Sequence, residues 1–316
     1  MDFKKKYLKY KLKYLNLKIL GGSMPKNKRV KVSPIFDALN RGNLQNAIAY
    51  LNSPSSWDSF PDLLNEVNED GYTALMFVAN QDPSQLGLTL INALLHRGAD
   101  PNIRHKNGTT ALIISVKKYW FDAFITLLNY NADPNIQDAN KSTALMYAAE
   151  NGANLFVRRL IEKGANVNIV NYINWTALIY ASMNKQFFVV KELLKANADP
   201  NIKTKLGATA LTFAIKHATN NIVKELLDAN AHPNIRDIRG YTPLMLAVKR
   251  RGNEDENISI VEHLLNAKAN ILLKNNKDRN MTALDYAINE SSYEIINILR
   301  ENKKDVLKKS KRNKPY

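Results

Sequence analysis

The chain has 316 residues, of which 45% are hydrophobic, enough apolar material for a folded core, so a wholly disordered protein is excluded. It contains no cysteine, so disulfides, zinc–thiolate centres and a cysteine nucleophile are excluded together. No segment has the roughly 18 uninterrupted apolar residues of a transmembrane helix. Lysines interrupt the N-terminal segment where a secretory signal would be apolar. We therefore expect an intracellular protein that is neither secreted nor membrane-spanning.

The formal net charge of +16 is confined to the two ends of the chain. Residues 1–32 contain eleven Lys or Arg and one Asp, and residues 303–316 contain seven Lys or Arg and one Asp. The segment between them has 27 basic and 27 acidic residues and is therefore neutral. This distribution predicts a basic N-terminal arm (1–32), a neutral folded domain (33–302) and a basic C-terminal tail (303–316).

The N-terminal arm favours a basic amphipathic helix. Between Phe3 and Leu20, aromatic and aliphatic residues form a stripe at helical spacing, lysines cover much of the rest, and Gly21 follows as a helix stop. A strand is the alternative, because apolar residues alternate with lysines from Leu8 to Tyr14. A basic amphipathic helix suits an anionic membrane, nucleic-acid phosphates or an acidic partner groove. Packing against the end of the folded domain is the purely structural alternative.

The arm resembles a leader, rich in Lys, Tyr and Leu and ending in Gly-Gly, that is found on proteins of giant DNA viruses. The resemblance implies a targeting or packaging segment, with removal after Gly22 as one alternative, and a host cell's cytoplasm or nucleus as the place of action. Two basic clusters, 25–31 and 303–312, have the composition of nuclear-import signals. Solvated terminal charge is the alternative explanation of both clusters.

An internal repeat organises the rest of the chain. Thr-Ala-Leu or Thr-Pro-Leu recurs with spacings of 37, 33, 33, 33, 33 and 40 residues, with its Thr at positions 73, 110, 143, 176, 209, 242 and 282. A second marker, Gly or Asn followed by Ala, recurs every 33 residues, at positions 98, 131, 164, 197 and 230. Two independent markers that keep one period predict a stack of structural repeats.

Each repeat predicts two helices and a polar connection. The Thr suits a helix N-cap, and Pro243 suits the first helical position after Thr242, where its missing N–H costs little. A second helix follows, as in Phe187–Leu194 or Ile222–Leu227, and it ends at the Gly or Asn that best tolerates a left-handed backbone. A connection of about a dozen polar, turn-forming residues then leads to the next Thr.

This pattern resembles the ankyrin repeat. The resemblance rests on Thr-x-Leu, the following Ala, the Leu-Leu pair, Gly-Ala-Asp and the returning Asn, and it covers roughly 34–302. Pro34–Leu51 resembles an N-terminal capping unit. The resemblance implies an all-α solenoid of about eight helix-turn-helix units joined by β-hairpin loops. It also implies recognition of a partner protein through the hairpin tips and the inner helix surface, without a cofactor.

The sequence departs from the family pattern at two repeated positions. The His that usually follows Thr-Pro-Leu is absent, so packing is expected to replace the Thr–His hydrogen bond; the residues there are Met76, Ile113, Met146, Ile179, Thr212, Met245 and Asp285. The inter-helix Gly survives at Gly152, but other residues take its place at Tyr119, Lys185 and Ala218. A left-handed backbone would cost each of these residues about 1 kcal/mol.

Spacings of 37 and 40 imply insertions of four and seven residues. Aligning Leu95 with Leu265 places four extra residues near 81–88, five near 250–257 and two near 276–279. We expect all three insertions in loops, which repeat stacks tolerate.

No motif for catalysis or metal binding is found. The sequence lacks a Gly-rich phosphate loop, His-Glu-x-x-His and Gly-x-Ser-x-Gly. The five histidines are scattered, and the recurring aspartates mark turns. We expect no catalytic, cofactor-binding or metal site, and a monomeric scaffold that binds a partner protein, with a host protein as one candidate. The alternative is a tether, in which the basic arms hold nucleic acid or an anionic membrane through weak contacts and the repeats act as a spacer.

The predicted partner-binding surface lies on the hairpins after residue 165, where polar tips give way to apolar and aromatic ones. Exposed apolar clusters mark interfaces, and Trp, Tyr and Arg are enriched at binding hot spots. The predicted residues are Val170, Tyr172, Ile173, Trp175, Leu206, Arg236, Ile238, Arg239 and Tyr241. The structural alternative is that Trp175 and Tyr241 only cover the helix of a neighbouring repeat.

Overall fold

A computed structural model describes residues 34–53, 64–81, 83–217, 219–290 and 292–312. In these ranges the backbone forms sixteen α-helices, and its only β-bridges are the isolated pairs Val67–Thr73 and Asn275–Met281. The all-α repeat solenoid is therefore confirmed. The predicted helical arm (1–32), the basic cluster at 25–31 and Ala218 lie outside the described residues. None of the helices described combines the length and apolar character that a membrane crossing requires.

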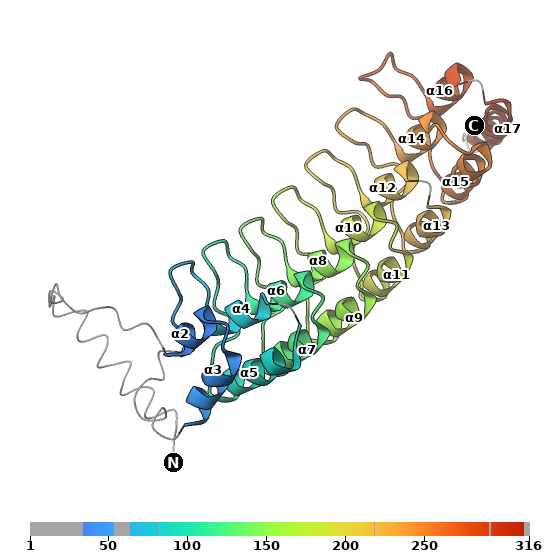
Figure 1. Ribbon diagram of the computed structural model, residues 1–316. Coiled ribbons are helices and arrows are strands. Elements are labelled where there is room, and N and C mark those ends of the chain that lie inside the picture. Colours follow the sequence, from blue (N-terminus) through green and yellow to red (C-terminus); the bar gives the residue numbers. More distant parts are fainter. Residues whose placement is uncertain (1–33, 54–63, 82, 218, 291, 313–316) are drawn as a thin grey trace. The chain divides into compact units, whose positions relative to one another are not determined.

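The helices belong to two compact units that meet in the sequence between Ala132 and Asp133. The first unit contains α2 (Pro34–Asn40), α3 (Leu44–Asn52), α4 (Ala74–Ala79), α5 (Gln85–His96), α6 (Ala111–Lys117) and α7 (Phe121–Asn129). Helices α2, α4 and α6 pack in one row and α3, α5 and α7 in a second (Figure 1). The expected capping unit near the N-terminus is the helix pair α2 and α3.

The second unit repeats the same arrangement. It contains α8 (Ala144–Glu150), α9 (Asn154–Glu162), α10 (Ala177–Met183), α11 (Phe187–Lys195), α12 (Ala210–Lys216), α13 (Asn220–Asp228), α14 (Pro243–Lys249), α15 (Glu254–Asn266), α16 (Ala283–Glu290) and α17 (Tyr293–Arg312). The even-numbered helices form one row and the odd-numbered helices the other, while the hairpin loops extend from the even-numbered row (Figure 1). Helix α17 runs on to Arg312, past position 303, where the basic tail was expected to begin.

The recurring Thr caps the first helix of each repeat, as predicted. In six repeats the Thr side-chain oxygen interacts with the third residue of its helix, as when Thr176 accepts the N–H of Ile179 at 3.2 Å. In the seventh, the N–H of Asp285 donates to Thr282. Pro243 occupies the first helical position. An N-cap of this kind stabilises a protein by about 1 kcal/mol.

The expected replacement of the Thr–His hydrogen bond by packing is correct at most repeats, but at three repeats the side chain also contacts the backbone of the N-cap residue. Met76, Ile113, Met146, Ile179 and Met245 are buried, at 1–2% relative exposure. Thr212 and Asp285 instead accept the backbone N–H of their own N-cap residues, Thr209 and Thr282, at 3.1 and 2.8 Å. Met245 Sδ accepts the N–H of Thr242 at 3.5 Å in the same way, so a reciprocal capping pair takes over the polar role of the missing His at three positions.

Left-handed backbone occurs where the sequence predicts it. The residues that end the second helices have φ angles between 60° and 94°, at Gly98, Asn131, Gly164, Asn197 and Asn230, and Lys268 repeats this conformation at 63°. Between the two helices of a repeat, Gly152, Tyr119 and Lys185 have φ angles of 70°, 54° and 60°. The last two residues therefore carry the conformational cost that the sequence indicates.

The prediction that all the inserted residues lie in loops is wrong for two of the insertions. Helices α7, α9, α11 and α13 each have nine residues, but α5 has twelve and α15 has thirteen. The extra residues therefore mainly lengthen these helices at their N-termini. Asn253 caps α15 by accepting the N–H of Glu256, and three acidic residues occupy its first turn, where the helix dipole favours them.

Candidate protein-interaction surface

Four consecutive hairpin tips of the second unit are four-residue turns, each held by the side chain of its first residue. Asp138, Asn171, Thr204 and Asp237 each accept two backbone N–H groups from their own turn, at 2.9–3.3 Å. The fourth residue of each turn is left-handed, with φ between 56° and 84°, at Lys141, Asn174, Gly207 and Gly240. Polar side chains of the first residue and a left-handed fourth residue thus set the shape of each tip.

Successive tips are joined by backbone hydrogen bonds. The N–H of Tyr172 donates to the carbonyl of Asn140 at 3.1 Å, and the N–H of Lys205 donates to Ile173 at 3.2 Å. The N–H of Ile238 donates to Leu206 at 3.0 Å. These bonds connect four consecutive hairpins at their tips, so side chains on different repeats are held in one continuous row.

A second row of hydrogen bonds joins the repeats at the base of the hairpins. The amide group of Asn168 donates to the carbonyl of Asn197 at 3.4 Å and accepts the N–H of Asp199 at 2.8 Å. Asn135 and Asn201 make the same pair of contacts one repeat earlier and one repeat later. The returning Asn of the repeat pattern is therefore a connector between repeats.

The even-numbered helices, from which the hairpins extend, present aromatic side chains to the hairpins; we call this side of the repeats the inner face. Tyr147 on α8 donates its hydroxyl to Asp138 Oδ2 at 2.6 Å, and Tyr180 on α10 accepts from the amide of Asn171 at 2.9 Å. Burial, followed by the hydrogen bond and charge of Asp138, raises the pKa of Tyr147 above its usual value. Burial and the charge of Glu150 raise the pKa of Tyr180. Phe213 occupies the same position on α12, behind Thr204, whose hydroxyl accepts the N–H groups of Leu206 and Ala208 in its own turn.

Four apolar or aromatic residues of the predicted partner-binding set are exposed on the row of tips. The relative exposures are 55% for Tyr172, 46% for Ile173, 63% for Leu206 and 51% for Ile238. Because Lys205 bonds to Ile173 and Ile238 bonds to Leu206 through the backbone, these side chains come from hairpins that touch. The structure thus brings the apolar members of the predicted set together.

Two predicted aromatic residues, Trp175 and Tyr241, are half-buried and contact helices. The ring of Trp175 lies 5.0 Å from the rings of both Tyr180 on α10 and Phe213 on α12. Tyr241 lies 5.6 Å from the ring of Tyr286 on α16, and its hydroxyl donates to Asp278 at 3.1 Å. Each aromatic therefore packs against the next repeat while keeping part of its surface accessible to solvent.

The remaining predicted residues occupy different positions on the hairpins. Val170 is half-buried, and its carbonyl accepts the amide of Gln137 from the preceding hairpin at 3.1 Å. Arg236 is partly exposed and directly precedes Asp237, the first residue of the hairpin turn. Arg239 is exposed at the tip and forms an ion pair with Asp237 at 3.5 Å. Of these three, Arg239 is best placed to reach a partner.

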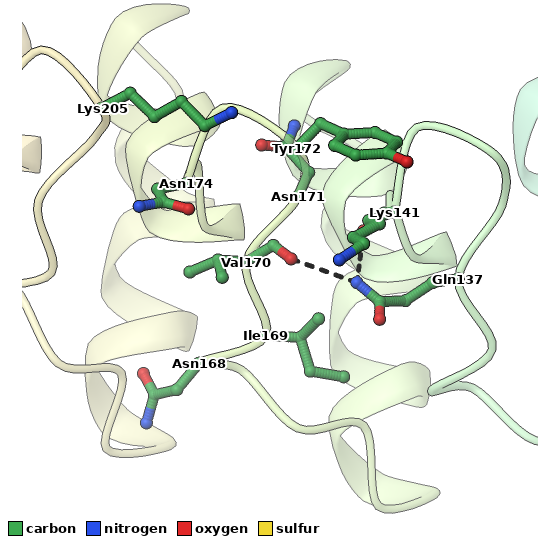
Figure 2. A pocket seen from close by; sticks show the side chains of 9 residues that line it. All are labelled: Gln137, Lys141, Asn168, Ile169, Val170, Asn171, Tyr172, Asn174 and Lys205. Atoms are coloured by element: carbon green, nitrogen blue, oxygen red, sulfur yellow. Dashed lines mark hydrogen bonds between the residues drawn. The ribbon is translucent and has the colours of Figure 1, made fainter.

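An open hollow of about 600 Å³ lies between the hairpins around Gln137 and Tyr172 (Figure 2). Its lining is Gln137, Lys141, Asn168, Ile169, Val170, Asn171, Tyr172, Asn174 and Lys205. The amine of Lys141 lies 5.3 Å from the centre of the Tyr172 ring, a cation–π distance. The hollow is therefore polar, cationic and bordered by one aromatic ring.

Sequence reasoning missed the two lysines of this hollow and the inner-face residues Tyr147, Tyr180 and Phe213. The three inner-face residues are four positions after the capping Thr of their repeats, and each Tyr bonds to an Asp or Asn nine positions before it. A Tyr nine residues after an Asp or Asn, and four after the capping Thr, could therefore have predicted a contact between helix and hairpin. Nothing in the local sequence marked Lys141 and Lys205, because their importance depends on how adjacent hairpins align.

Comparison with protein families identifies the repeat directly. A model of three copies of the ankyrin repeat matches the chain in six overlapping segments, at residues 35–138, 84–171, 121–204, 156–237, 178–275 and 211–310. Together these segments span most of the chain. A search of curated proteins gives no significant match. In the part of the chain that the structure describes, no cluster of His, Asp and Glu has the arrangement of a metal site.

Proposed function

Because the chain belongs to the ankyrin repeat family, whose repeats generally act as protein–protein interaction modules, we propose that it is a scaffold that binds a partner protein through the hairpin tips and inner helices of its second unit. Members of this family are typically non-catalytic, and we propose the same for this chain. The proposed contact residues are the predicted set from Val170 to Tyr241, together with Lys141 and Lys205.

The observation that carries this proposal is the exposed apolar row at the hairpin tips. Tyr172, Ile173 and Leu206 each expose about half of their surface or more, although hairpin tips are ordinarily polar. Burying such side chains in an interface contributes about 25 cal/mol for each Å² of apolar area removed from water. The backbone hydrogen bonds between tips hold these side chains in fixed positions, so less conformational entropy is lost when a partner binds.

The test is replacement of Tyr172 and Ile173 by Ala in the full chain. An affinity capture from cells first identifies a partner, and titration then compares the variant with the parent protein. A hot spot loses about 2 kcal/mol or more of binding free energy, with little change in the melting temperature because both side chains are exposed. Unchanged affinity together with a sharp fall in melting temperature would contradict the proposal.

A second candidate function is the tether, favoured by the confinement of excess charge to the chain ends. In this proposal the basic arms hold nucleic acid or an anionic membrane, and the repeats act as a spacer. A salt titration distinguishes the two functions, because binding through phosphate contacts weakens steeply with salt and binding through apolar contacts does not. Deletion of residues 1–32 should abolish the tether and leave partner binding intact.

The arms are also proposed to determine where the protein acts. Their composition supports targeting inside a host cell, in line with the resemblance of residues 1–22 to viral leaders. A fluorescent fusion that lacks residues 1–32 should redistribute, while its thermal melt should stay within a few degrees of that of the full chain. A large drop in melting temperature would instead mean that residues 1–32 stabilise the folded domain.

A further inference from the structure

Charge is unevenly exposed on four consecutive hairpins of the second unit, although the folded body is neutral. The four hairpin segments 136–142, 169–175, 202–208 and 235–241 contain five basic residues and two acidic ones. Both acidic side chains are turned into the structure, since Asp138 is 6% exposed and the side chain of Asp237 is also 6% exposed. The carboxylates hold their own turns, and among the cations Arg239 is paired with Asp237 at 3.5 Å.

The cations with no acidic partner among the described residues lie beside the exposed apolar row. Lys141 and Lys205 are exposed and line the same hollow, next to Tyr172 and Asn174 (Figure 2). No salt bridge involves either lysine in the part of the chain that the structure describes. A carboxylate that enters the hollow would thus meet two amines and an amide donor, with apolar side chains on the neighbouring tips.

The backbone at Lys141 determines which substitution removes its amine without adding strain. The fourth position of a hairpin turn has a left-handed backbone, with Gly at 207 and 240, Asn at 174 and Lys at 141, where φ is 56°. Gly and Asn adopt this conformation readily, but Lys does not. The same backbone occurs at Lys185 and Lys268, so Lys141→Gly would relieve backbone strain while it removes the amine from the hollow.

We propose that the hairpin row of the second unit binds an acidic peptide segment that also carries apolar side chains, with a carboxylate of that segment held between Lys141 and Lys205. This inference rests on the proposed function and specifies the chemistry of the partner. Complementary charge favours an acidic segment, and Ile173, Leu206 and Ile238 require apolar side chains on it. A nucleic acid would satisfy the lysines but would leave these aliphatic side chains without partners.

The experiment selects peptides from a random library displayed on phage, with the full chain as bait. Selected sequences are expected to be enriched in Asp or Glu interleaved with apolar residues. A labelled peptide of the consensus sequence is then titrated against Lys141→Gly and Lys205→Gln. Each variant should lose about fivefold in affinity, the upper end for a single exposed charge pair, and the loss should shrink as salt rises.

Lys185→Gly is the matched control. Lys185 is an exposed lysine with φ of 60° in the turn between α10 and α11, so the same substitution relieves the same backbone strain away from the hairpin tips. Both Gly variants should have a melting temperature equal to or above that of the parent. Only Lys141→Gly should weaken the peptide, which separates loss of the amine from a general effect on stability.

Several outcomes would overturn the inference. These are a library that yields no binders, a consensus without acidic residues, equal binding by Lys141→Gly, or stronger binding of a single-stranded RNA than of the peptide with the same dependence on Lys141. A non-acidic consensus whose binding is lost in Tyr172→Ala would overturn only the acidic partner and would leave the proposed scaffold function standing. Peptides that bind independently of both the lysines and Tyr172 would contradict both proposals.

Discussion

The hydroxyl of Tyr147 donates a 2.6 Å hydrogen bond to Oδ2 of Asp138, and this bond fastens helix α8 to the hairpin in front of it. Oδ1 of the same carboxylate accepts the N–H groups of Asn140 and Ser142, which shape the turn. One buried side chain thus sets the shape of the hairpin and also its attachment to the helix.

Replacing Tyr147 with Phe should therefore destabilise the protein by about 1–3 kcal/mol, because a buried carboxylate loses a donor. Urea unfolding measures this loss. The control is Tyr180→Phe, which removes an acceptor from the neutral amide of Asn171 and should cost about 1 kcal/mol. Equal losses in the two variants would mean that the charge of Asp138 contributes nothing to the attachment.

Gly207→Ala should disrupt the contact between two hairpins. A Cβ atom at position 207 would lie 3.1 Å from Asp237 Cα and from the backbone nitrogen of Ile238, and φ there is 71°. Gly164→Ala is the control, because φ is 82° and nothing lies within 4 Å of its added Cβ. Both variants bear the left-handed penalty of about 1 kcal/mol. Gly207→Ala should therefore lose more thermal stability than Gly164→Ala, and the difference measures the clash with the backbone of the next hairpin. Equal losses would contradict a close approach of the two hairpins.

Asn168→Ala should weaken the coupling between repeats. The substitution removes two hydrogen bonds, one to Asn197 and one from Asp199, at a cost of about 1–3 kcal/mol in total. Asn184→Ala is the matched control, because its amide bonds only within its own repeat, to the carbonyl of Tyr180. Hydrogen exchange should report faster local opening next to Asn168 and no such change in the control. Identical exchange in both variants would exclude a connecting role.

Acid should destabilise the last repeat through Asp285. Hydrogen bonds from the backbone and hydroxyl of Thr282 hold the pKa of this carboxyl below its ordinary value. As pH falls, the unfolded chain binds the proton first, so the stability that Asp285 contributes is present above its unfolded pKa and is lost as pH falls through its lower native pKa. Asp285→Asn should flatten the pH dependence of urea unfolding between about pH 5 and pH 3. An unchanged pH profile would contradict this assignment.

The sequence was sufficient to predict the repeats because their signals are local. A Thr before an apolar run, a Gly or Asn after one, and a fixed period each depend on a few neighbouring residues, and all three recur in the structure. Lys185 shows the strength of the period, since its left-handed backbone was predicted from alignment with Gly152 alone. Local chemistry of this kind can be read without knowledge of tertiary contacts.

Two kinds of feature were missed. One depends on whether an inserted segment forms a loop or extends a helix, and the other depends on how adjacent repeats align. The five residues inserted near Arg250 were expected in a loop, but Asn253 offers a strong cap and the acidic residues after it favour a helix N-terminus, so α15 lengthens instead. The hollow at Lys141 and Lys205 arises only when two hairpins align, which no single repeat specifies. The predicted apolar residues were found because their residue type is unusual at a hairpin tip.

The bonds between hairpin tips have a practical consequence for redesign. Tyr172, Lys205 and Ile238 contribute to these bonds through their backbone N–H groups, so the row does not depend on the identity of their side chains. Any residue with a backbone N–H can occupy the three positions, and proline alone is excluded. The recognition surface can therefore be rewritten residue by residue while the framework that presents it stays the same.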